Sequence, residues 1–152
     1  MASLLPIPGQ DVPLTDAQSF VPAKPWYDWL LRVQRTIAGT WVTFTPTLAP
    51  QTGSFTTVAA TGRYYQLGKL VFVNFGITIT TNGTAAGYID VSVPVAPNAI
   101  LGHVGCGKNQ LDSTSLNVKV VSTANFRVRK YDGTYPGVDG ALLECSITYE
   151  AA

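Results

Sequence analysis

The sequence predicts a mainly β protein, in which an antiparallel β-sandwich or jelly-roll-like domain follows an extended N-terminal arm and one short α-helix. Three observations predict this class. Beyond Gly39, apolar and polar residues alternate with a period of two, and glycine-containing turns separate the alternating runs. Only the segment 25–38 has helical periodicity. The chain of 152 residues is long enough for one ordinary domain with a core. We therefore expect three parts, which are an arm over 1–23, a helix over 24–39 and a β-sandwich domain over 40–152.

The first 23 residues are interrupted by prolines, at Pro6, Pro8, Pro13 and Pro22. Each proline fixes φ and lacks a backbone N–H, so this arm is expected to form neither a helix nor a regular strand. Its apolar side chains are more numerous than a disordered tail usually carries. Two interpretations stay open, an arm that lies in a groove of another subunit and a loose terminus. The expected arm contacts are Leu4, Leu5, Ile7 and Phe20.

The predicted helix has one apolar stripe. Pro25 suits its first turn, and Gly39 suits the position after its last turn. Fourteen residues are close to the marginal length for an isolated helix in water, so this helix needs a surface to pack on. That surface is either its own domain or another chain, and two tryptophans on the stripe are typical of interface anchors. The residues expected to mediate oligomerisation or docking are Trp26, Trp29, Leu30, Val33 and Ile37.

The β region begins with a Thr-rich strand over 41–48, in which Pro46 indicates an edge or a bulge. Residues 54–66 are expected to hold a strand, a turn at Thr61 and Gly62, and a second strand. The next strand, over 69–81, should direct a run of alternating apolar residues from Val71 to Ile79 to one face.

Asn82 and Gly83 then predict a tight hairpin that leads into a returning strand over 87–95. Three further strand regions are expected before the C-terminus, and a turn-rich loop lies before the last of them. Their ranges are 99–108, 116–122 with 124–130, and 141–149, and the loop covers 130–140.

Composition argues against several partners. Ten basic and nine acidic residues give a formal net charge of +1, so no broad field attracts nucleic acid or an anionic membrane. No apolar run approaches the roughly 20 residues that span a bilayer. The N-terminus lacks the basic and apolar regions of a secretory signal, so we expect synthesis and folding in a cytoplasm.

No pattern of catalytic residues is present, and we expect no enzymatic activity, cofactor or metal. His103 is the only histidine, and a lone histidine in a strand is more often structural than a general base. Cys106 and Cys145 cannot supply a four-ligand metal site without histidines. In a cytoplasmic product these two residues are expected to be free thiols, with a disulfide as the open alternative.

A glycan site is the binding hypothesis that the sequence supports. Four tyrosines lie near expected turns, Tyr64, Tyr65, Tyr131 and Tyr135. Aromatic faces beside acidic or amide groups can hold a sugar, although exposed tyrosines are also ordinary in β proteins. The candidate glycan contacts are Tyr131, Asp132 and Tyr135.

The stretch from Trp41 to Pro94 contains a Trp-led, Thr-rich strand (TWVTFTPTL), a turn with Gly62, Tyr65 and Gly68, a long hydrophobic strand and an Asn-Gly hairpin. It resembles a module of tailed-bacteriophage structural proteins, particularly tail-fibre and related virion proteins. The segments PIPGQDVPLTD and PWYDWLLRV are also similar to the short openings of many small phage virion proteins.

This resemblance implies a virion component without enzymatic activity, commonly trimeric, with its N-terminus attached to the particle and a β-rich knob exposed. We expect a homotrimeric short fibre or spike-like projection of a bacteriophage, made in the host cytoplasm and located in the virion. Its partners would be capsid or tail proteins, with a host surface glycan as a further candidate for host attachment. Two alternatives stay open, a capsid or tail decoration or connector protein without host contact, and a small carbohydrate-binding module.

Overall fold

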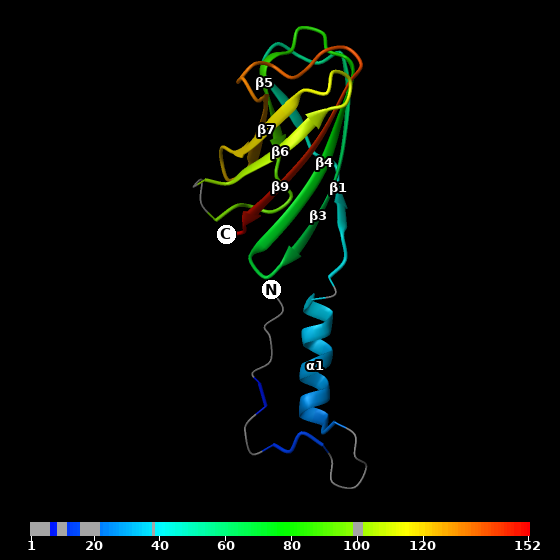
Figure 1. Cartoon of the computed structure of the whole chain (residues 1–152), viewed down its shortest axis with the longest axis vertical. Coiled ribbons are helices and arrows are strands. Elements are labelled where there is room, and N and C mark those ends of the chain that lie inside the picture. Colours follow the sequence, from blue (N-terminus) through cyan, green and yellow to red (C-terminus); the bar gives the residue numbers. More distant parts are fainter. Residues whose placement is uncertain (1–6, 9–11, 16–21, 38, 99–101) are drawn as a thin grey trace. The chain divides into compact units, whose positions relative to one another are not determined.

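The computed structural model describes residues 7–8, 12–15, 22–37, 39–98 and 102–152, and the side chains of residues 35–37 lie outside the described part (Figure 1). The chain divides into two units, Met1–Thr40 and Trp41–Ala152. Each unit is described by itself below.

The first unit contains the helix α1, Lys24–Ile37. Its apolar residues recur at helical spacing, and Pro25 lies in the first turn, where a missing N–H costs no helical hydrogen bond. The segment before the helix contacts itself, because Thr15 and Pro22 form an isolated antiparallel bridge. The backbone N–H of Ala23 also donates to the carbonyl of Leu14 at 3.0 Å.

The second unit is formed by nine strands. Their bounds are β1 Val42–Phe44, β2 Leu48–Thr52, β3 Thr57–Leu67, β4 Leu70–Thr81, β5 Ala86–Ser92, β6 Val104–Asn109, β7 Ser115–Val120, β8 Asn125–Lys130 and β9 Ala141–Glu150.

These strands form one antiparallel sheet in the order β1-β3-β4-β9-β6-β7-β8-β5-β2. The sheet curls so that its inner face packs against itself. Phe75 of β4 stacks on Phe126 of β8 with ring centroids 5.9 Å apart, although three strands lie between β4 and β8 in the sheet order. This arrangement confirms the predicted mainly β, antiparallel, sandwich-like class with one short helix.

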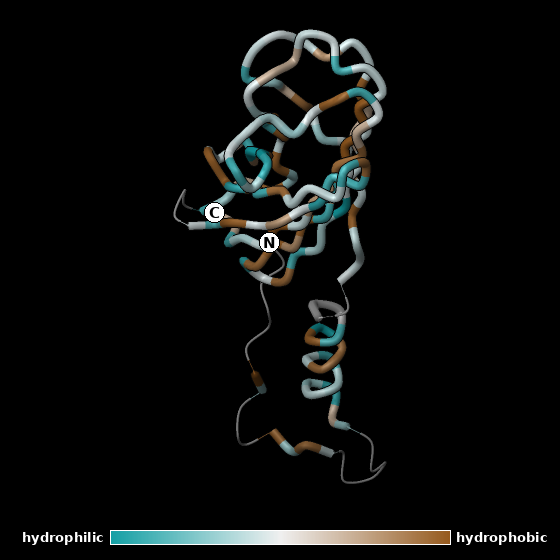
Figure 2. The backbone as a smooth tube through the Cα atoms, turned by 45° about the horizontal axis from the view of Figure 1, so that its top comes forward, coloured by the Kyte–Doolittle hydropathy of each residue, from teal (hydrophilic) through white to brown (hydrophobic). Residues whose placement is uncertain are grey.

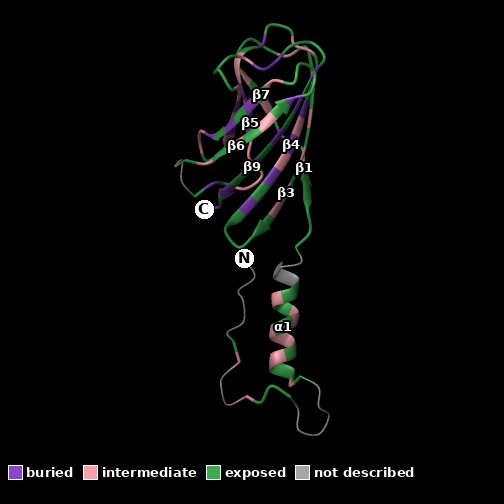
Figure 3. Ribbon diagram, in the orientation of Figure 1, coloured by how far each residue is buried: buried purple, intermediate pink, exposed green. Residues whose placement is uncertain are grey.

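Strict alternation places the core on the inner face. On β4, every second residue from Val71 to Ile79 is buried, as the sequence predicts, and β9 repeats this pattern from Ala141 to Tyr149. Figure 3 shows the alternation along both strands, and Figure 2 shows the hydropathy that produces it. Burial of these branched and aromatic side chains contributes on the order of 2 kcal/mol each before the cost of chain entropy.

The strand expected over 41–48 is divided at Pro46. The two parts, β1 and β2, follow one another in the chain but lie at opposite edges of the sheet. Proline lacks the N–H that a central strand needs, so a position between two edge strands suits it.

The expected turn at Thr61 and Gly62 is wrong, because both residues lie within the continuous strand β3. Gly62 is needed there for packing, since a Cβ atom at this position would collide with the ring of Phe44. Of Gly62, Tyr65 and Gly68, which the sequence suggested for one turn, only Gly68 occupies a turn, between β3 and β4, where its φ is 59°.

The expected hairpin at Asn82 and Gly83 is also wrong. The chain does turn there, but β4 pairs with β3 and β9, whereas β5 pairs with β8 and β2. The side chain of Asn82 donates to the carbonyl of Ala85 at 2.9 Å and accepts from the hydroxyl of Tyr135 at 2.7 Å. These contacts hold a turn that carries the chain to the opposite side of the curled sheet.

Candidate functional site

The helix α1 presents apolar side chains that are not buried. No residue of α1 whose side chain the structure describes is buried, and Tyr27 and Leu30 are 51% and 47% exposed. Trp29 and Val33 are partly exposed. Ile37 lies in the helix, but its side chain is outside the described residues. The stripe that the sequence predicts is therefore present over Trp29, Leu30 and Val33, and the described residues of its own unit do not bury it.

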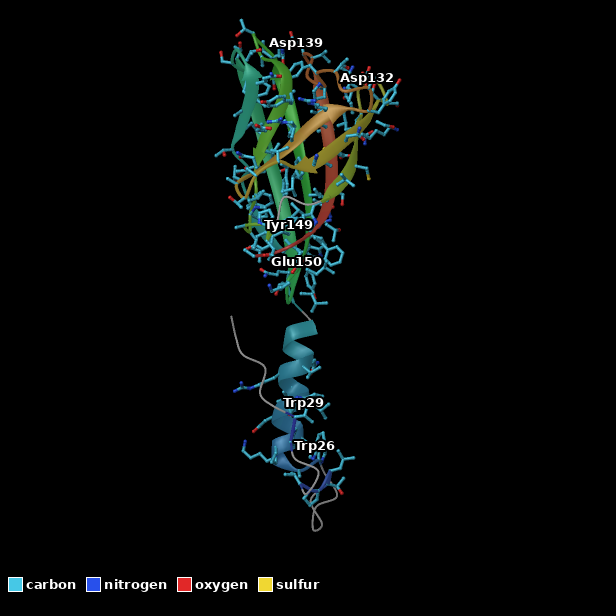
Figure 4. The ribbon with its side chains drawn as sticks, turned by 90° about the vertical axis from the view of Figure 1, so that its left-hand side faces the viewer. Trp26, Trp29, Asp132, Asp139, Tyr149 and Glu150 are labelled. Carbon is cyan, nitrogen blue, oxygen red and sulfur yellow. The ribbon has the colours of Figure 1, made fainter. Side chains whose placement is uncertain are left out.

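Trp26 has a different environment from the rest of the stripe. Its indole Nε1 donates to the backbone carbonyl of Val12 at 3.1 Å. Its ring also meets Trp29 edge to face, with centroids 6.2 Å apart, and Figure 4 labels both rings on α1. Trp26 thus connects the arm to the helix within one chain, an internal role that the sequence did not indicate.

The expected arm contacts are only partly described. Leu4, Leu5 and Phe20 lie outside the described residues. Ile7 is described and is 67% exposed. The arm therefore presents at least one large apolar side chain to solvent.

The three candidate glycan contacts of the 130–140 loop have different environments. Tyr135 packs against the core and donates its hydroxyl to Asn82. The hydroxyl and backbone N–H of Thr134 donate to Asp132 and hold the pKa of this carboxyl below its ordinary value. Tyr131 alone is strongly exposed, at 68%. The polar groups of Tyr135 and Asp132 therefore already form hydrogen bonds within the protein.

A groove that the sequence did not indicate lies on the outer face of the sheet, with a volume of about 760 Å³. It crosses β3, β4, β9 and β6, where cross-strand neighbours form two parallel rows. The first row is Arg63, Asn74, Ser146 and Cys106, and the second row is Thr61, Gly76, Glu144 and Lys108. The groove is thus lined by hydroxyl, amide and charged groups from these four strands, and Thr43 of β1 completes the lining.

An aromatic row lies beside this groove on the same face. Tyr65 and Phe72 are cross-strand neighbours, and each lies two residues along its strand from the pair Arg63 and Asn74. The ring of Trp41 is 6.0 Å from Tyr65, and Tyr65 is 6.4 Å from Phe72. Trp41 and Phe72 are 43% and 38% exposed, so the row presents aromatic surface to solvent.

Two cations lie on opposite sides of the groove. The guanidinium of Arg63 lies 4.9 Å from the centroid of the Trp41 ring, a cation–π contact. Within the described part of the chain, neither Arg63 nor Lys108 forms an ion pair. Glu144, between them, accepts a hydrogen bond from the side chain of Gln110. The groove therefore has two cationic groups that form no salt bridge in the described chain, and Glu144 is the cross-strand neighbour of Lys108.

The cysteines and the histidine show no arrangement for nucleophilic chemistry. Cys106 and Cys145 are free, and Cys106 is exposed while Cys145 is buried. Burial raises the pKa of the Cys145 thiol to about 12, so at neutral pH it stays a protonated, weakly nucleophilic group. His103 packs edge to face with Tyr149, their centroids 6.3 Å apart.

Two buried groups, Tyr149 and Cys145, and the partly buried Tyr135 predict a loss of stability in alkali. Burial raises the pKa of Tyr135, Tyr149 and Cys145 to about 12, above their ordinary values of 10.0 and 9.0. Because their ionised forms are favoured in the unfolded chain, their contribution is fully present below pH 9 and is lost as the pH rises toward 12. We expect the free energy of unfolding, measured by urea titration, to be constant between pH 7 and pH 9 and to decrease above that range.

The variant Tyr149→Phe tests whether ionisation of these groups causes the loss of stability in alkali. It removes one titrating hydroxyl, which donates to the carbonyl of Val95 at 2.7 Å in the folded protein. The alkaline decrease should be shallower in this variant, while the protein is less stable at neutral pH because the hydrogen bond is lost. A decrease that begins already near neutral pH would contradict the assignment.

The described residues contain neither a cluster of metal ligands nor a membrane-spanning helix. No group of three or more histidine, cysteine, aspartate or glutamate side chains in the described segments is arranged to hold a metal ion. No described helix has the length and apolar character that a membrane crossing needs.

Comparison of the chain with protein-family models, with curated proteins and with solved structures finds no match. The features that bear on function are therefore those of the molecule itself. They are the apolar stripe of α1, which its own unit leaves unburied, and the groove with its aromatic row.

Proposed function

We propose that this protein is a non-enzymatic structural component of a bacteriophage virion. It acts as a homotrimeric short fibre or spike-like projection, attached to the particle through its N-terminal region and displaying the β domain. The alternative is a decoration or connector protein of the capsid or tail. The resemblance of residues 41–94 to phage virion modules suggests a location in a virion. The helix supports assembly into an oligomer.

One observation supports oligomerisation through α1. A 14-residue helix is marginal in water, yet α1 has no buried residue among its described side chains. Its stripe includes Trp29, Leu30 and Val33, and tryptophan and leucine stabilise a helix chiefly when another surface covers them. Copies of the same helix provide such a surface, because three stripes can pack around a common axis with knobs-into-holes contacts.

Assembly would also give the β domain a function without a single tight site. Identical domains on one particle bind a surface together, so the avidity exceeds the affinity of each domain. The low net charge of +1 agrees with this role, since no field of one sign would repel neighbouring copies.

The mass of the full chain in solution tests the proposal. We expect light scattering coupled to size-exclusion chromatography to give three times the 16.2 kDa of one chain. The double variant Trp29→Ala, Leu30→Ala should dissociate to monomers, because central interface anchors each contribute about 2 kcal/mol or more.

The matched control is Gln34→Ala, on an exposed polar position of the same helix. It should leave the mass unchanged. A wild-type chain that is strictly monomeric at high concentration would contradict the trimeric fibre. An oligomer that survives the double variant would move the assembly contact away from α1.

A further inference from the structure

Gly76 is a glycine that the fold itself does not require. It lies in the middle of β4, and its φ is not in the left-handed region. A Cβ atom at Gly76 would meet only the carbonyl of Leu143, at 3.9 Å, which is an ordinary contact. At each of the other glycines in described strands, a Cβ atom would collide with a neighbouring group, and these are Gly62, Gly87, Gly105 and Gly107.

A glycine inside a strand weakens it and commonly marks a place where a ligand or another backbone approaches closely. Gly76 lies at the floor of the outer groove, in one row with Thr61 on β3 and Glu144 on β9. Without a side chain there, the groove remains open down to the backbone. Gly76 therefore indicates that something occupies the groove.

The lining suits a carbohydrate. Sugar hydroxyls need closely spaced donors and acceptors, which Asn74, Ser146 and Thr61 supply. The apolar C–H faces of a sugar ring need an aromatic platform, which Trp41 and Phe72 supply in the adjacent row. A few convergent polar groups beside aromatic surface are the usual composition of a small-molecule site.

The charges select an acidic carbohydrate. Arg63 and Lys108 have no ion-pair partner in the described chain and lie three strand intervals apart, about 14 Å at the usual strand spacing. A carboxylate on the ligand would pair most readily with Arg63, because its cross-strand neighbours Thr43 and Asn74 carry no charge and its planar fork binds a carboxylate in two hydrogen bonds. The separation gives room for a short chain of linked sugars.

We propose that the outer groove over β3, β4, β9 and β6 binds a short oligosaccharide that contains a carboxylate-bearing sugar. Arg63 or Lys108 binds the carboxylate, Asn74 and Ser146 contact hydroxyls, and the row from Trp41 to Phe72 supports an apolar sugar face. Every lining residue belongs to one chain, so the site does not rest on the proposed trimer.

A second copy of the chain is a less suitable occupant. A symmetric contact between two such faces would bring Arg63 and Lys108 of one copy close to the same cations of the other copy. Like charges brought together at an interface cost several kcal/mol.

Titration calorimetry on the full chain tests the proposal. The probes are sialyllactose and trigalacturonic acid, with lactose as the neutral partner of the first. We expect at least one acidic probe to bind with a dissociation constant in the millimolar range or below, and lactose to bind about tenfold more weakly because its charge-assisted hydrogen bond is missing. Binding of the acidic probe should weaken as salt is added.

Gly76→Val is the decisive variant. It fills the groove while adding a β-branched residue that strands favour, so the protein should fold and lose binding about tenfold or more. Thr78→Val, two residues further on the same face of β4 and outside the groove lining, should bind normally. Arg63→Gln and Lys108→Gln should weaken the acidic probe, whereas Lys119→Gln, an exposed cation on β7, should not.

Several outcomes would overturn the site. These are the absence of binding by both acidic probes, equal binding of sialyllactose and lactose, and full binding by a folded Gly76→Val protein. A Gly76→Val protein that binds nothing but also loses its oligomeric mass would assign the groove to a protein contact. Because mass and binding are measured separately, failure of the trimer would leave the carbohydrate result interpretable.

Discussion

Replacing Phe126 by alanine is expected to lower the free energy of unfolding by about 4 kcal/mol. Phe126 is fully buried on β8, where it stacks on Phe75 of β4 at 5.9 Å and meets Tyr149 of β9 edge to face at 5.5 Å. The side chain therefore joins the two sides of the curled sheet. Its removal leaves a cavity that the surrounding strands cannot close, because their hydrogen-bonded registers fix the backbone.

Urea unfolding followed by circular dichroism measures this loss. The matched control is Phe72→Ala, which removes the same side chain from β4 but on the outer face, where Phe72 is 38% exposed. We expect the control to cost less, about 1 to 2 kcal/mol, since more than a third of the Phe72 side chain stays exposed in the folded protein and its removal leaves no enclosed cavity. Equal losses in the two variants would mean that Phe72 is covered in solution, or that the sheet does not close over Phe126.

Much of the β fold was predictable because burial imposes a period of two on a strand with one solvated face. The strand over 69–81 and the strand over 141–149 were predicted within about one residue, since each carries a long uninterrupted alternation. In both strands, every residue that the structure buries is hydrophobic, whereas the apolar residues Leu70, Phe72 and Leu142 lie on the outer face and are exposed. The local pattern is sufficient to predict a strand and its buried face where the alternation within that strand alone determines which side faces the core.

Strand pairing was not predictable from local pattern. Asn82 and Gly83 favour a hairpin, and the residues after them do form the strand β5. However, β5 pairs with β8 and β2, because β4 already has β3 and β9 as partners. The turn is fixed by Tyr135 and Asp139, which hydrogen-bond Asn82 from more than fifty residues away in the sequence. No window around Asn82 contains that information.

The groove was missed for the same reason. Its lining comes from five strands that become neighbours only in the folded sheet, and each strand contributes ordinary polar residues. Of the tyrosines that the sequence places near turns, Tyr65 lies in the aromatic row beside the groove. The candidate glycan contacts were instead assigned to the 130–140 loop, where the fold uses Tyr135 and Asp132 for its own hydrogen bonds. One sequence signal was available, which is a glycine inside the most regular strand, at Gly76.

The glycines of β6 and β4 allow the structure to be tested at two backbone positions. Replacing Gly107 by alanine is expected to lower the free energy of unfolding by about 3 kcal/mol. A Cβ atom at Gly107 would lie 2.5 Å from the carbonyl oxygen of Glu144 and 2.7 Å from the sulfur of Cys145. Since both contacts belong to β9, the pairing partner of β6, relief requires the two strands to separate and lose ladder hydrogen bonds.

The identical change at Gly76 is expected to have the opposite sign. Alanine there meets only an ordinary contact and removes the conformational freedom of glycine from the unfolded chain, so Gly76→Ala should gain about 0.5 to 1 kcal/mol. Denaturant unfolding of both variants measures these changes. A shifted midpoint with an unchanged m-value reports a change in the free energy of unfolding alone. If Gly107→Ala were as stable as the wild type, the register of β6 against β9 would be wrong. If Gly76→Ala were destabilising, the fold itself would require this glycine, and the groove would lose its strongest sign of a ligand.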